Sequence, residues 1–100
     1  MEIKRPQVSS PVTYEHEFWE DGAAVDLTNA TSCRIIFYEV ADAGTTSVVG
    51  AFNADKTTGK ITASFTASEI GEMRWQGAFT DGDGEHFGPI HSEQIIANLV

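Results

Sequence analysis

Residues 12–19 read Val-Thr-Tyr-Glu-His-Glu-Phe-Trp, and this stretch decides the fold class. Ring-bearing or apolar side chains at Val12, Tyr14, His16 and Phe18 alternate with the polar side chains of Thr13, Glu15 and Glu17. Successive side chains of a β-strand point to opposite faces of the sheet. The stretch therefore predicts a strand with one face in the core and the other in water.

Turn chemistry follows directly after this strand. Residues 20–23 read Glu-Asp-Gly-Ala, and Gly22 can adopt positive φ without steric cost. We expect a tight reversal here, leading into the short apolar piece at residues 24–27.

Short runs of β-branched and aromatic residues, separated by turn residues, continue to the end of the chain. Residues 32–40 are apolar on both faces and predict a central strand, whereas Gly50 places a weaker strand at a sheet edge. One helical turn is expected at Ser68-Glu69-Ile70-Gly71, and a hairpin turn at Asp81-Gly82-Asp83-Gly84. The expected later strands are 47–52, 60–66, 73–80, 85–87 and 90–100.

The chain has 100 residues, which suits one domain, and 41% of them are hydrophobic. We assign residues 12–100 to a single antiparallel β-sandwich of about seven strands. Residues 1–11 contain two prolines and little patterning, and we expect them to form an N-terminal arm or an edge strand.

Fifteen acidic residues against six basic ones give a net charge of −9, which disfavours nucleic acid and anionic membranes as partners. The single cysteine, Cys33, cannot close an intrachain disulfide, and no signal-peptide or membrane-span pattern is present. A chain made in a reducing cytoplasm is expected. Inside a strand, Cys33 is expected to pack as a small hydrophobic residue.

Candidate metal sites are weak in this sequence. The Asp81 to Glu85 segment has calcium-like carboxylate spacing, but His86 and Ser92 occupy the places where a calcium loop needs glycine and glutamate. His86 and His91 have a zinc-like spacing that His16 could join. On a regular strand, however, residues five apart point to opposite faces, although Pro89 could alter that. We therefore expect no metal, no cofactor and no enzymatic activity.

The candidate interaction residues are Trp19, Glu15 and Glu17, which strand parity places together on the outer face of the first strand. The two glutamates are interpreted as part of a solvated acidic face rather than as catalytic carboxylates. An exposed Trp19 would suggest an interface hot spot, whereas an indole folded over the end of the sandwich would be structural.

Several stretches resemble the immunoglobulin-like domains of tailed-phage virion proteins, in particular the N-terminal domain of baseplate upper proteins. The similar stretches are an aromatic strand leading through Asp-Gly to Asp-Leu-Thr, a glycine-led middle strand, a glycine-plus-aromatic strand, and a proline before the last strand. In this sequence they are residues 18–31, 58–65, 71–75 and 88–90.

The resemblance implies an immunoglobulin-like β-sandwich that serves as a structural or assembly subunit of a phage or prophage particle. Its partners would be other virion proteins and copies of itself, and it would pass from the host cytoplasm into the virion. An alternative from a different class is a carbohydrate-binding module using Trp19, Trp75 and the Asp81 to Glu85 loop. A small hydrolase lacks a recognisable catalytic arrangement.

Overall fold

The structure is a computed structural model that describes residues 11–96. The described residues form β-strands of very different length, some of only two residues, and one 3-10 turn. In chain order the elements are β1 (Pro11–Glu17), β2 (Trp19–Glu20), β3 (Ala23–Ala24), β4 (Ser32–Glu39), β5 (Gly44–Val49), β6 (Ala51–Phe52), η1 (Lys56–Thr58), β7 (Lys60–Thr66), β8 (Gly71–Asp81) and β9 (Gly84–Ile95). None of the helical structure in the described range has the length and apolarity needed to cross a membrane.

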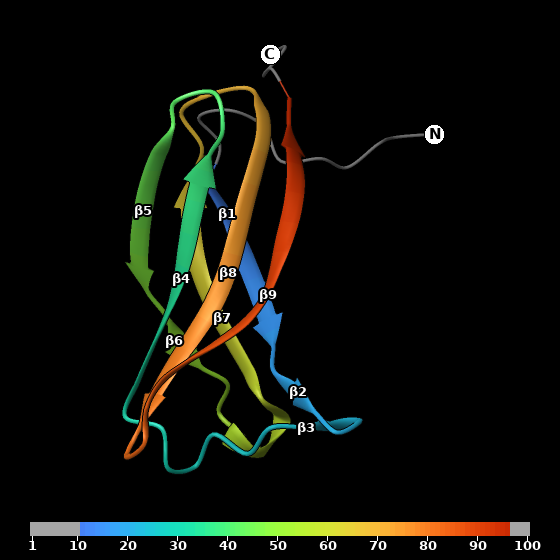
Figure 1. Cartoon of the computed structure of the whole chain (residues 1–100), viewed down its shortest axis with the longest axis vertical. Coiled ribbons are helices and arrows are strands. Elements are labelled where there is room, and N and C mark those ends of the chain that lie inside the picture. The colour runs from blue at the N-terminus through green and yellow to red at the C-terminus, as the bar shows by residue number, and fades with distance from the viewer. Residues whose placement is uncertain (1–10, 97–100) are drawn as a thin grey trace.

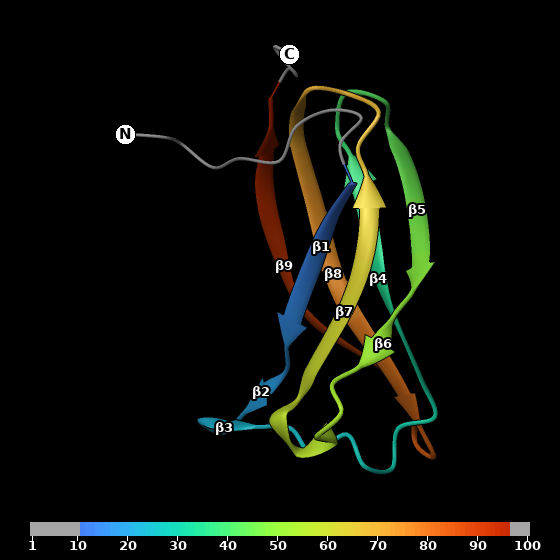
Figure 2. The ribbon, with the colours of Figure 1, turned by 180° about the vertical axis from the view of Figure 1, so that it is seen from behind.

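Seven of these strands form two antiparallel sheets (Figures 1 and 2). One sheet has the order β1-β7-β6, and the other has the order β5-β4-β8-β9. These orders correspond to the B-E-D and C′-C-F-G sheets of an immunoglobulin-like sandwich. The expected fold class, an all-β immunoglobulin-like sandwich, is confirmed. β2 and β3 form a separate hairpin at one end of the molecule.

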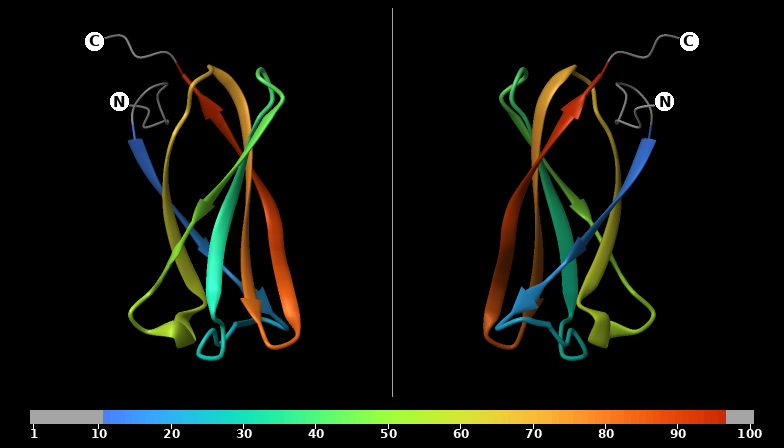
Figure 3. Two further views of the ribbon diagram at one scale, coloured as in Figure 1. Left: turned by 90° about the vertical axis from the view of Figure 1, so that its left-hand side faces the viewer. Right: turned by 90° about the vertical axis from the view of Figure 1, so that its right-hand side faces the viewer.

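Aromatic side chains fill the space between the two layers, which Figure 3 shows edge-on. Tyr14 from β1 lies 5.1 Å from Phe37 and 5.4 Å from Trp75, measured between ring centroids. Phe37 stacks on Phe65 of β7 at 4.3 Å. Fully buried Ile35, Ile61, Met73 and Ile95 complete this core. The burial of Tyr14, beside the charges of Glu93 and Glu39, raises its pKa to about 12.

Where a strand is regular, the alternation of apolar and polar residues correctly predicted which side chains are buried. Tyr14, His16 and Phe18 are buried, whereas Thr13 and Glu15 are exposed. The strand predicted at residues 60–66 has the same bounds in the structure. Asp21 and Gly22 form the predicted reversal with φ values of 52° and 78°. Residues 1–10 of the predicted arm lie outside the described residues, and Pro11 already belongs to β1.

The edge position predicted for residues 47–52 is confirmed, but the prediction of one continuous strand there is wrong. The chain forms β5 at the edge of the four-stranded sheet and then β6 in the other sheet, with Gly50 between them. The Gly50 amide donates to the Cys33 carbonyl at 3.0 Å. A Cβ at Gly50 would lie 3.1 Å from the Cys33 Sγ and 3.2 Å from the Thr62 carbonyl oxygen. Glycine therefore suits the point where the chain passes tightly between the layers, because a larger residue would require these neighbours to shift.

The predicted helical turn at residues 68–71 is also absent. This segment is a loop whose amides bind a side chain distant in sequence, the buried carboxylate of Glu39. The backbone amides of Ser68 and Glu69 donate to Glu39 Oε2 at 3.1 and 2.9 Å, and Ser68 Oγ donates to Oε1 at 3.2 Å. The carboxylate thus satisfies amide groups that a helical turn would have left without partners.

Strand β9 contains a bulge that shifts its register against β8. Gln76 pairs with Ile90 and Ala78 pairs with Phe87, so Gly77 alone faces both Gly88 and Pro89. The Gln76 amide nitrogen donates to the Gly88 carbonyl at 2.8 Å, which satisfies a group displaced from the ladder. Pro89 was expected to precede the last strand, but it lies inside β9. The last strand, predicted over residues 90–100, instead begins at Gly84, and residues 97–100 lie outside the described residues.

We predict that Glu39→Ala lowers the free energy of unfolding by about 2 kcal/mol, because it removes hydrogen bonds to a buried charged acceptor. Denaturant unfolding followed by tryptophan fluorescence measures the change. Glu39→Gln, which keeps one acceptor oxygen, should lose less. Glu15→Ala on the solvated face should change stability by less than about 0.5 kcal/mol. An unchanged unfolding midpoint for Glu39→Ala would contradict the role of this carboxylate.

Candidate functional site

His16 lies where the free edge of one sheet meets the free edge of the other. Its side chain is 1% exposed and faces Gly77 of β8 and Gly88 of β9. A Cβ on Gly77 would come within 2.7 Å of the imidazole, and a Cβ on Gly88 would come within 2.2 Å of its Nε2. The two glycines therefore make room for the ring. Phe18, at 4.4 Å between centroids, closes another side.

A second imidazole contacts the first. His16 Nδ1 and His91 Nε2 are 3.0 Å apart, and His91 stacks on Trp75 at 4.3 Å. Burial, aided by the nearby His91, lowers the pKa of His16 to about 4. His16 Nε2 is buried and has no hydrogen-bond partner in the described part of the chain, so a proton there would be unsatisfied. His16 is therefore neutral at physiological pH.

The expectation that His86 and His91 point to opposite faces is wrong. The extra residue at Gly88-Pro89 restores the same parity, and both rings face inward, with His86 on Phe79 and His91 on Trp75. His16 joins His91, but His86 Nε2 instead contacts Asp81 Oδ1 at 2.9 Å. Within residues 11–96, no three His, Cys, Asp or Glu side chains converge so as to hold a metal ion.

The calcium-like segment forms the predicted hairpin between β8 and β9, with Asp81 paired to Gly84. Asp81 Oδ1 accepts hydrogen bonds from the Asp83 amide and from His86, and these bonds lower the pKa of Asp81. The carboxylate therefore stabilises its own turn, as aspartate commonly does.

The three candidate interaction residues are close together, as parity predicted. Trp19 begins β2 with 60% of its surface exposed, and its Nε1 donates to Glu17 Oε1 at 2.7 Å. Glu15 lies on the same outer face and is exposed. The indole projects into water and does not cover the end of the sandwich. The hydrogen bond to Glu17 holds one edge of the indole and limits its motion.

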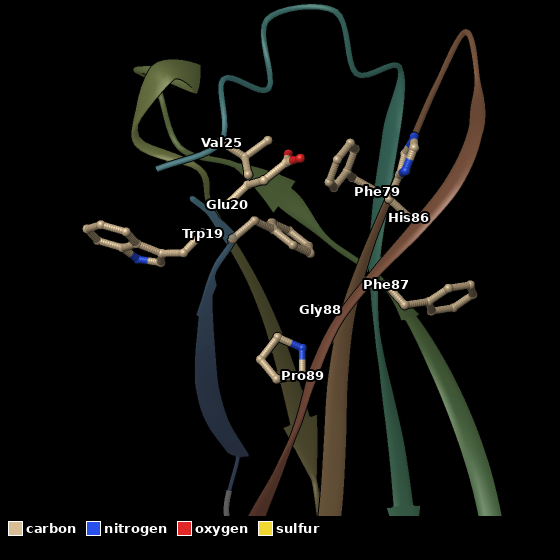
Figure 4. Close-up of a pocket in the computed structure, with 9 residues that line it drawn as sticks. Trp19, Glu20, Val25, Phe79, His86, Phe87, Gly88 and Pro89 are labelled. Carbon is tan, nitrogen blue, oxygen red and sulfur yellow. The ribbon is translucent and has the colours of Figure 1, made fainter. Parts of the chain in front are cut away.

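Beside Trp19, a cleft of about 280 Å³ opens between β2 and β9. Figure 4 shows Trp19 and Phe87 pointing away from each other at the two sides of this cleft. Its lining also includes a carboxylate, an imidazole, two buried phenyl rings and an exposed proline, contributed by Glu20, His86, Phe18, Phe79 and Pro89. Sequence reasoning missed Glu20 and Phe87. The available signal was Gly88-Pro89 within a strand, which marks a bulge and a change of facing direction.

Two residues considered for chemistry are instead part of the core. Trp75 is 7% exposed, so it is unavailable to a sugar and the three-part glycan site predicted from sequence does not assemble. Cys33 is buried and packs in the core as expected, and burial raises the pKa of its thiol. A thiol with a raised pKa is a poor nucleophile.

The pKa of His16 predicts acid destabilisation. Because the folded-state pKa of about 4 lies below the ordinary histidine pKa of 6.5, the folded protein binds fewer protons between these pH values. Lowering the pH from 7.5 to 4 should therefore cost about 3 kcal/mol of stability through His16. In denaturant titrations, the stability difference between wild type and His16→Asn should shrink by that amount over this range.

Thr13→Asn, at an exposed and uncharged position of the same strand, is the matched control and should follow the wild-type pH dependence. The lowered pKa values of the surface carboxylates Asp26, Asp55, Glu72 and Glu85 are common to all three proteins and cancel in the comparison. Parallel pH profiles for wild type and His16→Asn would show that His16 is not buried in its neutral form.

Comparison with known proteins adds information on the fold. No protein-family model and no curated protein sequence matches the chain. A solved structure described as a "putative glycoside hydrolase", from Bacteroides vulgatus, matches with a TM-score of 0.61 and 11% sequence identity. The match covers 96% of this chain and 17% of that chain. At this identity the likeness shows a shared β-sandwich fold and nothing further.

Proposed function

We propose that this chain is a non-enzymatic structural or assembly subunit of a phage or prophage particle, acting through protein–protein contacts. The observation that carries the proposal is the exposed, tethered Trp19 at one end of a rigid sandwich. Tryptophan is enriched among the residues that dominate binding energy at protein interfaces. Fixing the indole before binding reduces the entropy lost when a partner covers it.

The positions of the stretches that resemble phage immunoglobulin-like domains support this proposal. Residues 18–31 contain the β2–β3 hairpin and lead into β4, and residues 58–65 contain most of β7. Residues 71–75 open β8. The turn chemistry and the strands thus fall in the order that the resemblance implies, although Pro89 lies within the last strand. In this proposal the protein moves from the host cytoplasm into the virion.

Carbohydrate binding is the second candidate, and the cleft beside Trp19 favours it. Glu20 and His86 offer polar groups there, and Pro89 and Phe79 offer apolar walls, an arrangement suited to a small polar ring. The fold likeness to a protein described as a putative glycoside hydrolase is compatible with this candidate. Carbohydrate binding is placed second because the Trp19 ring points away from the cleft (Figure 4).

Replacing Trp19 by alanine tests both candidates. We expect Trp19→Ala to remove the protein from particles purified after induction or infection, measured by quantitative mass spectrometry against the major virion proteins. Folding should be preserved, since an exposed side chain contributes within about 0.5 kcal/mol.

Ile70→Ala is the matched control, because Ile70 is 55% exposed in the loop at the opposite end of the sandwich. It should be incorporated like wild type. Absence of the wild-type protein from particles would contradict the virion proposal. Binding to immobilised glycans that is lost in Trp19→Ala or Glu20→Ala would establish the carbohydrate candidate instead.

A further inference from the structure

The outer face of the four-stranded sheet exposes large apolar side chains on its two edge strands, β5 and β9. Its side chains form rows across the strands, and the register places Val49, Arg34, Ala78 and Phe87 in one row. The next row contains Ser47, Ile36, Gln76 and Ile90. Ile90 is 66% exposed, Phe87 53% and Val49 86%. This face, which turns toward the viewer in Figure 1, has no covering element in the described chain.

The bulge in β9 turns two of these apolar side chains outward. Residues 87 and 90 are three apart, so a regular strand would place one of them in the core. Because Gly88 and Pro89 together face Gly77, both Phe87 and Ile90 point outward. A groove of about 210 Å³ lies beside Ile90 and is lined by Ile36, Tyr38, Arg74, Trp75 and Gln76. Such apolar concavities commonly receive side chains of a binding partner.

The charges on this face cancel, unlike those on the rest of the molecule. Residues 11–96 contain four Lys or Arg and fourteen Asp or Glu, a net charge of −10. On the outer face of this sheet, however, two arginines are matched by two glutamates. Arg34 Nε and Nη2 contact Glu85 at 2.7 and 2.8 Å, and Arg74 Nε contacts Glu72 at 2.7 Å. Along the strand direction, Glu85 lies beyond one side of the two rows and the Arg74–Glu72 pair beyond the other, whereas Arg34 lies within the first row.

We propose that this face binds a second copy of the same chain, as a symmetric homodimer. Two bodies with strong like charge repel each other at most orientations, and a locally neutral face with exposed apolar side chains avoids that repulsion. A twofold axis would bring the same surface of each copy together, so that apolar rows meet apolar rows. This inference rests on the proposed function, because it assumes that the protein acts through surface contacts. It adds the identity of the partner at one of those surfaces.

The size of the face sets the expected affinity. Eight residues along each strand and four strands across give a face of roughly 26 by 19 Å. This is smaller than the ~800 Å² per partner of a standard interface. We therefore expect a reversible dimer with a dissociation constant of about 1–100 μM.

Sedimentation velocity with the full chain at increasing concentration tests the proposal. The mass of the wild type should rise from 10.8 kDa toward twice that value. Ile90→Asp should weaken the dimer at least tenfold, because it places an unpaired charge among the apolar side chains of the face. Amide NMR shifts that change on dilution should map to β4, β8 and β9.

Ile70→Asp introduces the same charge at a similarly exposed isoleucine outside the face and should dimerise like wild type. Trp19→Ala should also dimerise, which separates this proposal from particle incorporation. A wild type that stays monomeric to about 500 μM, five times the upper limit expected for a small interface, would overturn the inference. An Ile90→Asp variant that dimerises normally, or a dimer lost in Trp19→Ala instead, would also overturn it.

Discussion

The close approach of His16 to the backbones of β8 and β9 is the constraint on which the rest of the structure depends. The ring fits because Gly77 and Gly88 have no side chains, and it brings the free edge of one sheet against the other. The bulge at Gly88-Pro89 accommodates this contact. Once the register has shifted, His91 turns inward to meet His16, while Ile90 turns outward. A buried packing contact thereby determines which side chains the surface presents.

The residue pattern was sufficient to predict a strand where side chains alternate regularly between the core and water. In β1 and β7, side chains alternate between core and water without interruption, and their residue pattern alone predicted the facing direction of both strands and the bounds of β7. The first strand was predicted over residues 12–19 and runs from Pro11 to Glu17. Gly22 and the Asp-Gly pair before Gly84 predicted both hairpins through local backbone preferences. These features depend on neighbours in sequence, which is why no knowledge of the tertiary structure was needed.

The errors arose where a distant contact decides the local structure. At Gly50 the chain leaves one sheet and joins the other. The alternation of side chains continues through such a crossing, so the residue pattern does not show that the strand has ended. At residues 68–71 the buried carboxylate of Glu39, some thirty residues away, replaces the hydrogen bonds of a helical turn. For the candidate site, strand parity correctly predicted that Trp19 and Glu17 lie together. It could not reveal the cleft that β9 contributes.

The described chain enters at Pro11 and leaves at Ile96 at the same end of the sandwich, as Figures 1 and 2 show. Within residues 11–96, β1 pairs only with β7, and β9 pairs only with β8. Tension applied between these two points would peel each terminal strand from its neighbour one hydrogen bond at a time, instead of shearing a whole ladder at once. The domain is thus built to yield gradually under mechanical load applied through its ends.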